Sequence, residues 1–501
     1  IISQTDWHNA EPVQKLGRPR LAALITAGNL DSMLNEKTAA KKFRSRDSYS
    51  PGGEVGHRPE RATIVYANRM REAYKDVPII IGGIEASLRR FAHYDYWSNK
   101  VRHSILLDSK ADILSYGMGE HSVVEIADAL AEGKTVAEMY DIRGICYVTS
   151  RPPISDKTVV CPSYEDVKKD KLTFAKAFKM QYEEQDPFYG KTIIQPSENR
   201  FVVQTPPALP LTTAEMDAIY ELPFQRRWHP DYDAAGGVPA LHEVQFSLTS
   251  QRGCFGHCHF CAIASHQGRI IQNRSHESLV RETERMTHLP GFKGYIHDVG
   301  GPTANFRHVA CAKQLTDGAC RNRHCIGSET CPNLNTSHDD YLKLLREIRS
   351  VKGVKKVFVR SGLRYDYVLA DHNKAFVKEL CQYHVSGQLK VAPEHVVKHV
   401  TDLMGKADVH AFLKFKDWFD EANRELGKKQ YLVPYFMSSH PGCTLKDAVA
   451  LAEFLRDMHM QPEQVQDFIP TPGSLSTAMY YTGLNPLTGE KVYVARRPEE
   501  K

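Results

Sequence analysis

The sequence predicts an α/β protein in which an incomplete barrel of six β/α units follows a smaller α/β domain. Short apolar runs alternate with amphipathic stretches six times between residues 243 and 470, and a similar alternation runs from Pro19 to Asp141. Such alternation favours parallel sheets with helical crossovers. Glycines follow several of the apolar runs, at the strand ends where open α/β sheets bind their ligands.

The composition limits the functional classes. A chain of 501 residues exceeds one ordinary core, so we expect more than one domain. Apolar residues make up 42% and charged residues 25%, as in a globular protein, and the net charge of +5 makes nucleic acid a weakly supported partner. No run of eighteen apolar residues and no signal-like start is present, so we expect a cytoplasmic protein without membrane association.

Residues 1–141 are expected to form a Rossmann-like α/β domain. Leu21–Thr26 and Pro78–Gly83 are apolar runs typical of buried strands, and Ala62–Tyr74 between them has helical periodicity. Ala111–Glu120 repeats the order of a strand followed by glycines. The repeated order predicts a parallel sheet in this part of the chain.

The remaining residues divide into a connector, the barrel and a tail. Prolines punctuate residues 142–235, which we expect to connect the domains through helices. Residues 236–470 form the predicted barrel, and residues 471–501, with little helical periodicity, are expected to cover it. The barrel strands are predicted at Glu243–Leu248, Gly294–Val299, Lys356–Arg360, Gln388–Ala392, Tyr431–Met437 and Val465–Ile469. Helices are predicted at Asp339–Val351, Asn373–Tyr383, Val409–Leu426 and Leu445–Met458.

Three cysteines follow the first barrel strand with the spacing Cys-x3-Cys-x2-Cys, at Cys254, Cys258 and Cys261. Three thiolates on one loop can hold three irons of a [4Fe–4S] cluster and leave the fourth iron open to a small molecule. The alternative is a zinc site whose fourth ligand is one of three nearby histidines. These histidines are His257, His259 and His266.

The cysteine spacing, the aromatic Phe260 before the last cysteine and the position after a strand resemble the signature of the radical S-adenosylmethionine (SAM) superfamily. The resemblance implies a partial β/α barrel that binds SAM beside a [4Fe–4S] cluster. Reductive cleavage of SAM needs an electron from a low-potential cluster, which zinc cannot supply. We therefore also expect an electron donor such as flavodoxin or ferredoxin.

Candidate SAM contacts stand at the ends of successive strands. Gly300 and Gly301 follow the second strand, where a turn without Cβ atoms lets backbone carbonyls reach the SAM ammonium group. This turn resembles the Gly-Gly-Glu region of the superfamily, with Pro302 in place of the acid. Arg360 and Ser361 follow the third strand and could bind the SAM carboxylate.

The fourth and fifth strands supply further candidates. Glu394 could accept hydrogen bonds from the ribose hydroxyls of SAM, and Ser439 lies in a turn expected near the adenine. His440 is the candidate catalytic residue, because an imidazole titrates near neutral pH and could exchange a proton with a substrate.

A second cysteine set, Cys311, Cys320, Cys325 and Cys331, lies in the long connection after the second strand. Four thiolates could bind zinc or a second Fe–S cluster. The same four residues could instead be free thiols, and their spacing does not decide between these alternatives.

Longer runs resemble the YgiQ family of bacterial radical SAM proteins. They are Gly253–Arg269, Val391–His395, Ser439–Gly442 and Asp467–Gly473, with Gly82–Arg90 and Asp112–Glu120 earlier in the chain. The resemblance covers nearly the whole chain, departs from the family at its start, and implies a [4Fe–4S] cluster and SAM without implying a substrate.

Two of the early runs, Pro78–Gly83 and Asp112–Glu120, also resemble the cobalamin-binding-type domain that precedes many radical SAM cores. The Asp-x-His-x-x-Gly element that would ligate cobalt is absent from the sequence, so cobalamin is not expected. The first domain is expected to be an incomplete version of this type.

These observations predict a radical SAM enzyme that forms a 5′-deoxyadenosyl radical and acts on an unidentified substrate. One alternative is methylthiotransferase-like modification of RNA or protein with the help of a second cluster. Another is a non-catalytic, metal-stabilised module that binds RNA or protein.

Overall fold

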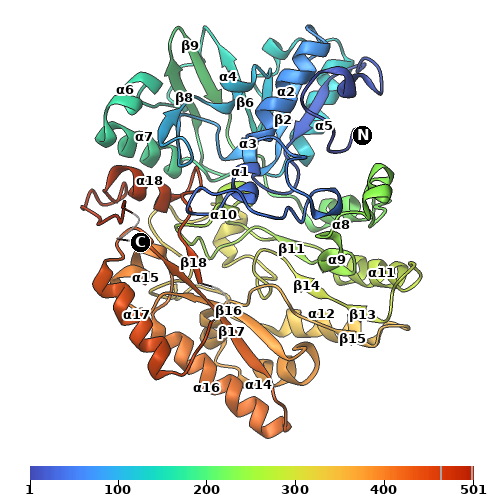
Figure 1. The fold of residues 1–501 in the computed structure, drawn as a ribbon, viewed down its shortest axis with the longest axis vertical. Helices are drawn as coiled ribbons and strands as arrows, with labels where there is room; N and C mark the ends of the chain where they lie inside the picture. Colours follow the sequence, from blue (N-terminus) through green and yellow to red (C-terminus); the bar gives the residue numbers. More distant parts are fainter. Residues whose placement is uncertain (463–464, 498–499, 501) are drawn as a thin grey trace.

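The computed structural model describes residues 1–462, 465–497 and 500, which form two stacked parts (Figure 1). The first part is built on a seven-stranded sheet, and the second contains six parallel strands surrounded by helices. Within the described ranges, no helix combines the length and apolarity needed to cross a membrane.

The first sheet begins with three parallel strands, in the order β1 (Ala23–Thr26), β2 (Ile79–Gly82) and β5 (Ile113–Ser115). Helix α2 (Ala62–Ala73) connects β1 to β2, and Ala67 and Met70 on its inner face pack against Ile79 and Ile81. Apolar residues such as Ile79–Ile81 are buried because helices cover both faces of the parallel strands. The predicted Rossmann-like arrangement is confirmed here.

The same sheet continues through four further strands, so the prediction of a connector over 142–235 is wrong for its larger part. The sheet extends through β6 (Ile145–Thr149), β9 (Arg200–Gln204), β8 (Thr192–Ser197) and β7 (Thr158–Val160). Strand β6 is antiparallel to both β5 and β9. Its β-branched and aromatic residues fit a pleated surface, and the prolines that suggested a connector lie mainly in loops between the strands.

Short elements complete the first part and the passage to the barrel. The helices are α1 (Ser32–Glu36), α3 (Gly83–Ser87), α4 (Ile105–Ser109), α5 (Glu120–Ala131), α6 (Tyr164–Lys169), α7 (Lys171–Glu183), α8 (Thr213–Tyr220) and α9 (Leu241–Val244). Strands β3 (His93–Asp95) and β4 (Lys100–Arg102) form a separate hairpin. Helix α9 occupies the predicted start of the first barrel strand, which therefore begins later than expected.

Six parallel strands succeed one another in chain order, which confirms the predicted incomplete β/α barrel. They are β10 (Ser247–Thr249), β13 with β14 (Tyr295–Ile296 and Asp298–Gly300), β15 (Lys356–Val357), β16 (Gln388–Glu394), β17 (Tyr431–Ser438) and β18 (Val465–Asp467). The second strand is broken, since β14 pairs with β10 and β13 pairs with β15. A bridge between Leu363 and Val391 joins the third strand's extension to β16, which pairs with β17.

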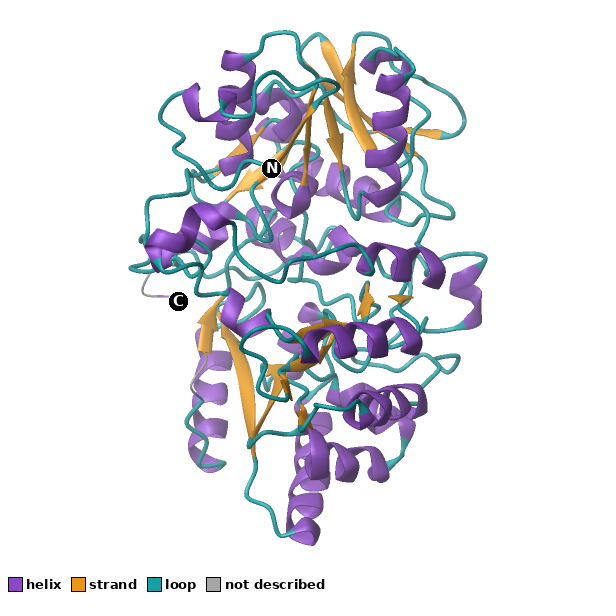
Figure 2. Cartoon of the chain, turned by 90° about the vertical axis from the view of Figure 1, so that its right-hand side faces the viewer, coloured by secondary structure: helices purple, strands orange, loops and turns teal. Residues whose placement is uncertain are grey.

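Helices cover the outer face of these strands (Figure 2). They are α11 (His276–Thr287), α12 (Asp339–Ser350), α13 (Tyr365–Asp371), α14 (Lys374–Glu379), α15 (Lys398–Met404), α16 (Val409–Leu426) and α17 (Leu445–Asp457). Leu389 and Val391 of β16 pack with Phe415 of α16 in the largest apolar core. Gln388 and Lys390, which alternate with them, therefore face the barrel interior.

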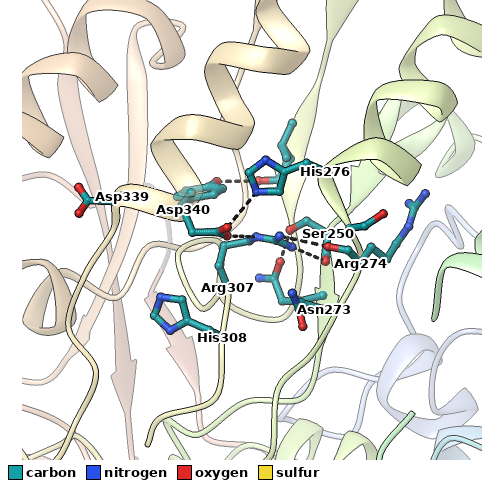
Figure 3. A network of polar contacts seen from close by, with 12 residues as sticks. Ser250, Asn273, Arg274, His276, Arg307, His308, Asp339 and Asp340 are labelled. Atoms are coloured by element: carbon teal, nitrogen blue, oxygen red, sulfur yellow. Dashed lines mark hydrogen bonds and ion pairs between the residues drawn. The ribbon is translucent and has the colours of Figure 1, made fainter. Parts of the chain in front are cut away.

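A buried polar network joins the first two barrel units (Figure 3). Arg307 donates to the carbonyl of Ser250 at 2.7 Å and to that of Arg274 at 3.1 Å. Its Nε donates to Asp340 at 3.0 Å, and His276 contacts the other oxygen of the same carboxylate at 2.9 Å. The network fixes α11 and α12 relative to the end of the first strand.

The tail contains a helix, which the weak helical periodicity of residues 471–501 did not indicate. Ser474 caps α18 (Leu475–Thr482) by accepting a hydrogen bond from Thr477 N. Tyr481 on this helix stacks on Tyr94 of β3 at 4.7 Å and meets Phe174 of α7 edge-on at 4.8 Å. The tail thus binds the barrel to the first part of the molecule, with α18 lying beside α7 in Figure 1.

Candidate functional site

A pair of short antiparallel strands holds the two ends of the cysteine loop together. It leaves β11 (Gln251–Arg252), passes through α10 (Ile263–Gln267) and returns as β12 (Gln272–Asn273), which is antiparallel to β11. Gly253 has φ +84°, and a Cβ there would lie 2.3 Å from the carbonyl oxygen of Ile270. Only glycine fits this conformation and this close approach, so the start of the loop has a fixed path.

Burial makes two thiols of the loop, Cys254 and Cys261, poor acids without a bound cation. It raises the pKa of Cys254, and it raises the pKa of Cys261 to about 12, with the neighbouring thiol of Cys258 adding to both shifts. Each sulfur therefore influences the others, which places the three together. Iron binds thiolates, so a bound cluster would stabilise charges that this environment otherwise disfavours.

The donor set fits a cluster better than a single ion. Across residues 1–462, 465–497 and 500, no group of three or more His, Cys, Asp or Glu side chains has an arrangement that could hold one metal ion. The described loop therefore contains no preformed zinc site with His257, His259 or His266. Ligands of a cubic cluster need not converge on one centre, because each thiolate binds its own iron.

The loop histidines instead hold the loop in place. His259 contacts the carbonyl of Leu403 through Nδ1 at 2.9 Å, and its backbone N donates to the carbonyl of Met404 at 2.9 Å. His257, at φ +45°, stacks on Tyr182 with ring centroids 5.3 Å apart. Ser476 N in the tail donates to the carbonyl of His259 at 3.0 Å. Helices α15, α7 and α18 thus all support the loop.

The turn after the second strand reaches the cysteine loop. Thr303 Oγ1 lies 3.5 Å from Cys254 Sγ. A Cβ on Gly301 would lie 2.5 Å from the carbonyl oxygen of Gln251, and one on Gly300 would lie 3.1 Å from Ser361 Oγ. The glycines are therefore required by close approach of the backbone to its neighbours.

Asp298, which sequence reasoning missed, organises the end of the third strand. Its carboxylate accepts hydrogen bonds from the backbone N of Arg360 at 2.7 Å and of Ser361 at 3.0 Å, and also from the hydroxyl of Ser361. The Arg360 side chain remains about half exposed, with Glu243 at 3.6 Å. Ser361 is thus engaged in fixing the turn, while Arg360 is available to a ligand.

One cavity joins several of these groups. It has a volume of about 840 Å³ and lies among the first four barrel strands. Its lining includes four predicted SAM contacts: Gly300, Gly301, Arg360 and Ser361. Lys390 also lines it. The cavity is large enough for a small-molecule ligand and is rich in polar groups.

The ends of the fourth and fifth strands supply two more of the predicted contacts, Glu394 and Ser439, which do not line this cavity. Glu394 and Ser439 are buried and adopt left-handed backbone conformations, with φ +66° and φ +60°. Burial raises the pKa of Glu394, although Lys406, with Nζ 3.8 Å from its carboxylate, opposes the shift. The Glu394 charge contributes to the raised pKa of Cys261.

His440 has the contacts of a structural residue. Its ring nitrogens lie 2.8 Å from the carbonyl oxygen of Pro441 and 2.6 Å from Ser476 Oγ. Burial lowers its pKa to about 3, so the ring is neutral near pH 7. These contacts anchor the tail and give no support to the catalytic role predicted for His440.

The second cysteine set gathers around Cys325. Burial raises the pKa of this thiol to about 11, and Cys311, Cys331 and Cys320 add to the shift, while Arg269 opposes it. The nearby His324 lies 3.3 Å from His259, nitrogen to nitrogen, and so connects the two cysteine-containing segments. The fold therefore brings the second set together, although its side chains do not converge on a single-ion site in the described structure.

Arg364 is a further residue that sequence reasoning missed. It follows the third strand and donates from Nη1 to Cys258 Sγ at 3.4 Å. Cys258 lies 106 positions earlier in the chain, so no local motif could reveal this contact.

Comparisons with known families and proteins cover the whole chain. Residues 1–247 match the family described as Radical SAM N-terminal, and residues 463–501 match a domain of unknown function, DUF3362. A UPF0313 protein of Clostridium perfringens (strain 13 / Type A) is 55% identical over 502 residues, covering 100% of this chain and 76% of that protein. A UPF0313 protein of Clostridium botulinum (strain Loch Maree / Type A3) is 54% identical over 501 residues, covering 100% and 78%.

Two solved structures resemble the chain more remotely. The radical SAM methyltransferase TsrM from Kitasatospora setae, with cobalamin and a [4Fe–4S] cluster bound, has a TM-score of 0.49 and 15% identity, covering 92% of this chain and 66% of its own. The cobalamin-dependent SAM radical enzyme OxsB, with aqua-cobalamin bound, has a TM-score of 0.43 and 11% identity, covering 84% and 45%.

Proposed function

Because the chain belongs to the UPF0313 family of radical SAM enzymes, we propose that it cleaves SAM reductively with a [4Fe–4S] cluster held by Cys254, Cys258 and Cys261. The observation that carries the proposal is the fixed loop that groups these three thiols beside the Gly300–Gly301 turn. When bound, such a cluster supplies one electron to SAM, which yields methionine and a 5′-deoxyadenosyl radical.

The protein's own residues prepare the SAM site. Asp298 holds the turn that presents Arg360, whose guanidinium group would bind the SAM carboxylate. Gly300 and Gly301 bring backbone groups close to the cysteine loop without side chains in the way. Glu394, whose charge influences Cys261, would accept hydrogen bonds from the ribose.

The substrate is proposed to be a polar molecule that enters the cavity of about 840 Å³. Cations at Arg360 and Lys390 and hydroxyls at Ser247 and Thr249 line this cavity. With Arg360 assigned to the SAM carboxylate, a polar ligand could still bind Lys390 and these hydroxyls, whereas an apolar ligand would cover them without forming hydrogen bonds. An electron donor such as flavodoxin or ferredoxin is the proposed partner, and the cytoplasm is the proposed location.

Anaerobic reconstitution with iron and sulfide tests the proposal. The wild-type protein should gain the absorbance and, after reduction, the EPR signal of a [4Fe–4S] cluster, and it should form 5′-deoxyadenosine from SAM. Cys258→Ala should lose both the cluster and the product. Cys381→Ala, which removes a buried thiol from the outer barrel core, is the matched control and should retain both. If the wild-type protein forms the cluster but leaves SAM intact, the proposal is wrong.

A second candidate function is methylthiotransferase-like modification of RNA or protein, which requires another cluster. The gathering of Cys311, Cys320 and Cys331 around Cys325 favours this candidate. Replacing Cys320, Cys325 and Cys331 together by Ala should remove about half of the iron if two [4Fe–4S] clusters bind. Zinc analysis of the same samples distinguishes a structural zinc ion from a second cluster. Unchanged iron and zinc contents would rule out a metal at the second cysteine set. We do not propose the non-catalytic alternative, because the chain matches the Radical SAM N-terminal family over residues 1–247.

A further inference from the structure

Arg364 places a buried positive charge against the cysteine loop. Its side chain is 8% exposed, and Nη1 donates to Cys258 Sγ at 3.4 Å. The other edge of the guanidinium group donates from Nε and Nη2 to the two oxygens of Asp366, at 2.8 and 2.6 Å. This two-point contact fixes the plane of the guanidinium group, so its remaining nitrogen is directed at the sulfur.

The surrounding residues fix Arg364 from both sides. Its backbone N donates to Asn305 Oδ1 at 3.0 Å, and Asn305 Nδ2 donates to its carbonyl at 3.2 Å. On the loop side, a Cβ on Gly256 would lie 2.7 Å from Nη1 and 3.4 Å from Cys254 Sγ. Gly256 thus provides the space through which the guanidinium group reaches Cys258.

We propose that Arg364 is a positioning residue that raises the reduction potential of the cluster held by the loop, through its hydrogen bond to the Cys258 sulfur. Reduction adds one electron and therefore one negative charge to the cluster. A buried cation that donates to a ligand sulfur stabilises the more negative state more strongly. The inference rests on the proposed function, since it requires Cys258 to ligate a [4Fe–4S] cluster.

The contact with Asp366 limits the size of this effect without removing it. The carboxylate neutralises much of the guanidinium charge at a distance, but the N–H group at the sulfur remains polarised by that charge. Asp366 also keeps Arg364 in place when the electron arrives, so little reorganisation is needed. We therefore assign the pair a tuning role at the cluster.

The test variant replaces both members of the pair, Arg364→Gln with Asp366→Asn. This double change removes both charges and leaves amides that can bond to each other, so no unpaired ion is buried. The reconstituted protein is titrated with a low-potential reductant in the absence of SAM, and the EPR signal of the reduced cluster is followed. We expect reduction to become about tenfold less favourable, a fall of about 59 mV in midpoint potential for a one-electron couple.

Two further variants test whether the change in midpoint potential is specific to the Arg364–Asp366 pair. Arg89→Gln with Asp31→Asn changes a comparable buried pair in the first domain and should leave the midpoint potential unchanged. Arg364→Lys keeps a positive charge but loses the two-point contact with Asp366. It should lower the potential by less than the double variant, and it provides a second measurement if the double variant does not fold.

The outcomes separate this inference from the proposed function. A lower midpoint potential with an unchanged iron content supports the tuning role. An unchanged potential, or loss of iron from the variants, overturns it, because Arg364 would then act elsewhere or in cluster assembly. Weaker SAM binding with an unchanged potential also overturns it and would assign Arg364 to the SAM carboxylate. A wild-type protein without a cluster would contradict the proposed function itself.

Discussion

At the scale of single residues, the strand ends around the cysteine loop carry backbone strain. Glu394 and Ser439 are both non-glycine residues in the left-handed region, at the ends of neighbouring strands. Such conformations cost about 1–3 kcal/mol each and persist where the surroundings enforce them, most often at functional sites. The pair therefore identifies the carboxyl ends of β16 and β17 as places where the surroundings keep a strained backbone conformation and so fix the side-chain positions.

Gly301 provides a prediction at this scale. In Gly301→Ala, the new Cβ would lie 2.5 Å from the backbone oxygen of Gln251, so the turn must move. We expect SAM affinity to fall by at least about tenfold, an effect of about 1.4 kcal/mol, measured by calorimetry on the reconstituted protein. Gly362→Ala is the matched control, because a Cβ on Gly362 would meet no neighbouring atom within 4 Å and the affinity should be unchanged. Equal affinities for both variants would contradict the role given to this turn.

Some residues of the candidate site could not be predicted from the sequence, because their partners lie far along the chain. The three loop cysteines carry their own signal in their spacing, and the glycine pair carries one in its position after a strand. Asp298 and Arg364 carry none, because their roles depend on contacts made 62 to 106 positions away. For His440, the ordinary pKa of an imidazole suggested proton exchange with a substrate. In the fold, burial and the neighbours of the ring determine its protonation instead.

At the scale of elements, the polar network of Figure 3 joins α11 and α12 through shared charges. Burial favours the protonated form of Asp340, but hydrogen bonds from His276 and Arg307 outweigh it and lower the Asp340 pKa to about 2. The same hydrogen bond to Asp340 is the largest influence raising the pKa of His276. Asp340 thus lies between His276 and Arg307, and Glu347 of α12 also contacts His276, at 2.7 Å.

Asp340→Asn should destabilise this junction. The almost fully buried Arg307 would lose its charged partner, and we expect a loss of about 1–2 kcal/mol in the free energy of unfolding, because Asp340 itself is partly exposed. Urea unfolding near pH 5.5 measures the change. Asp339→Asn is the control, since its side chain points away from the network in Figure 3, and it should have almost no effect. Equal losses in both variants would disprove the role of the network.

The pH dependence of the difference in unfolding free energy between wild type and Asp340→Asn is a separate prediction. The lowered pKa of Asp340 stabilises the fold above its ordinary value of 3.8, and this contribution is lost as the pH falls towards about 2. The raised pKa of His276 stabilises the fold below its ordinary value of 6.5, and this contribution is lost as the pH rises through the raised value. The difference between wild type and Asp340→Asn should therefore be largest between about pH 4 and 6.5. Unfolding series at several pH values check this, and a flat difference would refute it.

Elements with strong local signals could be predicted from the sequence. Helix α16 has the predicted bounds, Val409–Leu426, because Asp408 caps its start, Gly427 ends it and its apolar residues face one side. Strands β6, β8 and β9 were missed because their neighbouring prolines obscured a short β-branched pattern. Their antiparallel pairing in the first sheet depends on partners far along the chain. Helix α18 was missed because the consecutive residues Leu475–Tyr480 are all buried, polar ones included, and leave no helical stripe of apolar residues.

At the scale of the whole molecule, a few contacts fix the two parts to each other. Arg252, at the start of the cysteine loop, pairs with Glu120 of α5 and stacks on Tyr220 of α8. Gly117 lies so close to α10 that a Cβ would approach the carbonyl of His266 to 3.2 Å. The first sheet thus supports the loop directly.

Glu120→Gln tests this support. Arg252 is mostly buried and would keep its charge without a carboxylate partner, so we expect a loss of about 1–2 kcal/mol in unfolding free energy. We also expect faster proteolysis near the loop, measured by mass spectrometry of the fragments. Glu125→Gln changes an exposed residue of the same helix and should match the wild type. A Glu120→Gln protein as stable as this control would show that the contact contributes little.

The tail makes the arrangement of the loop dependent on the end of the chain. Ser476 contributes both the hydrogen bond to the carbonyl of His259 and the contact with the ring of His440. Translation proceeds from the amino end, so the cysteine loop leaves the ribosome well before Ser476 is added. Throughout that interval the growing chain lacks both contacts, so the tail fixes the positions of His259 and His440 only after α18 has been synthesised and has folded.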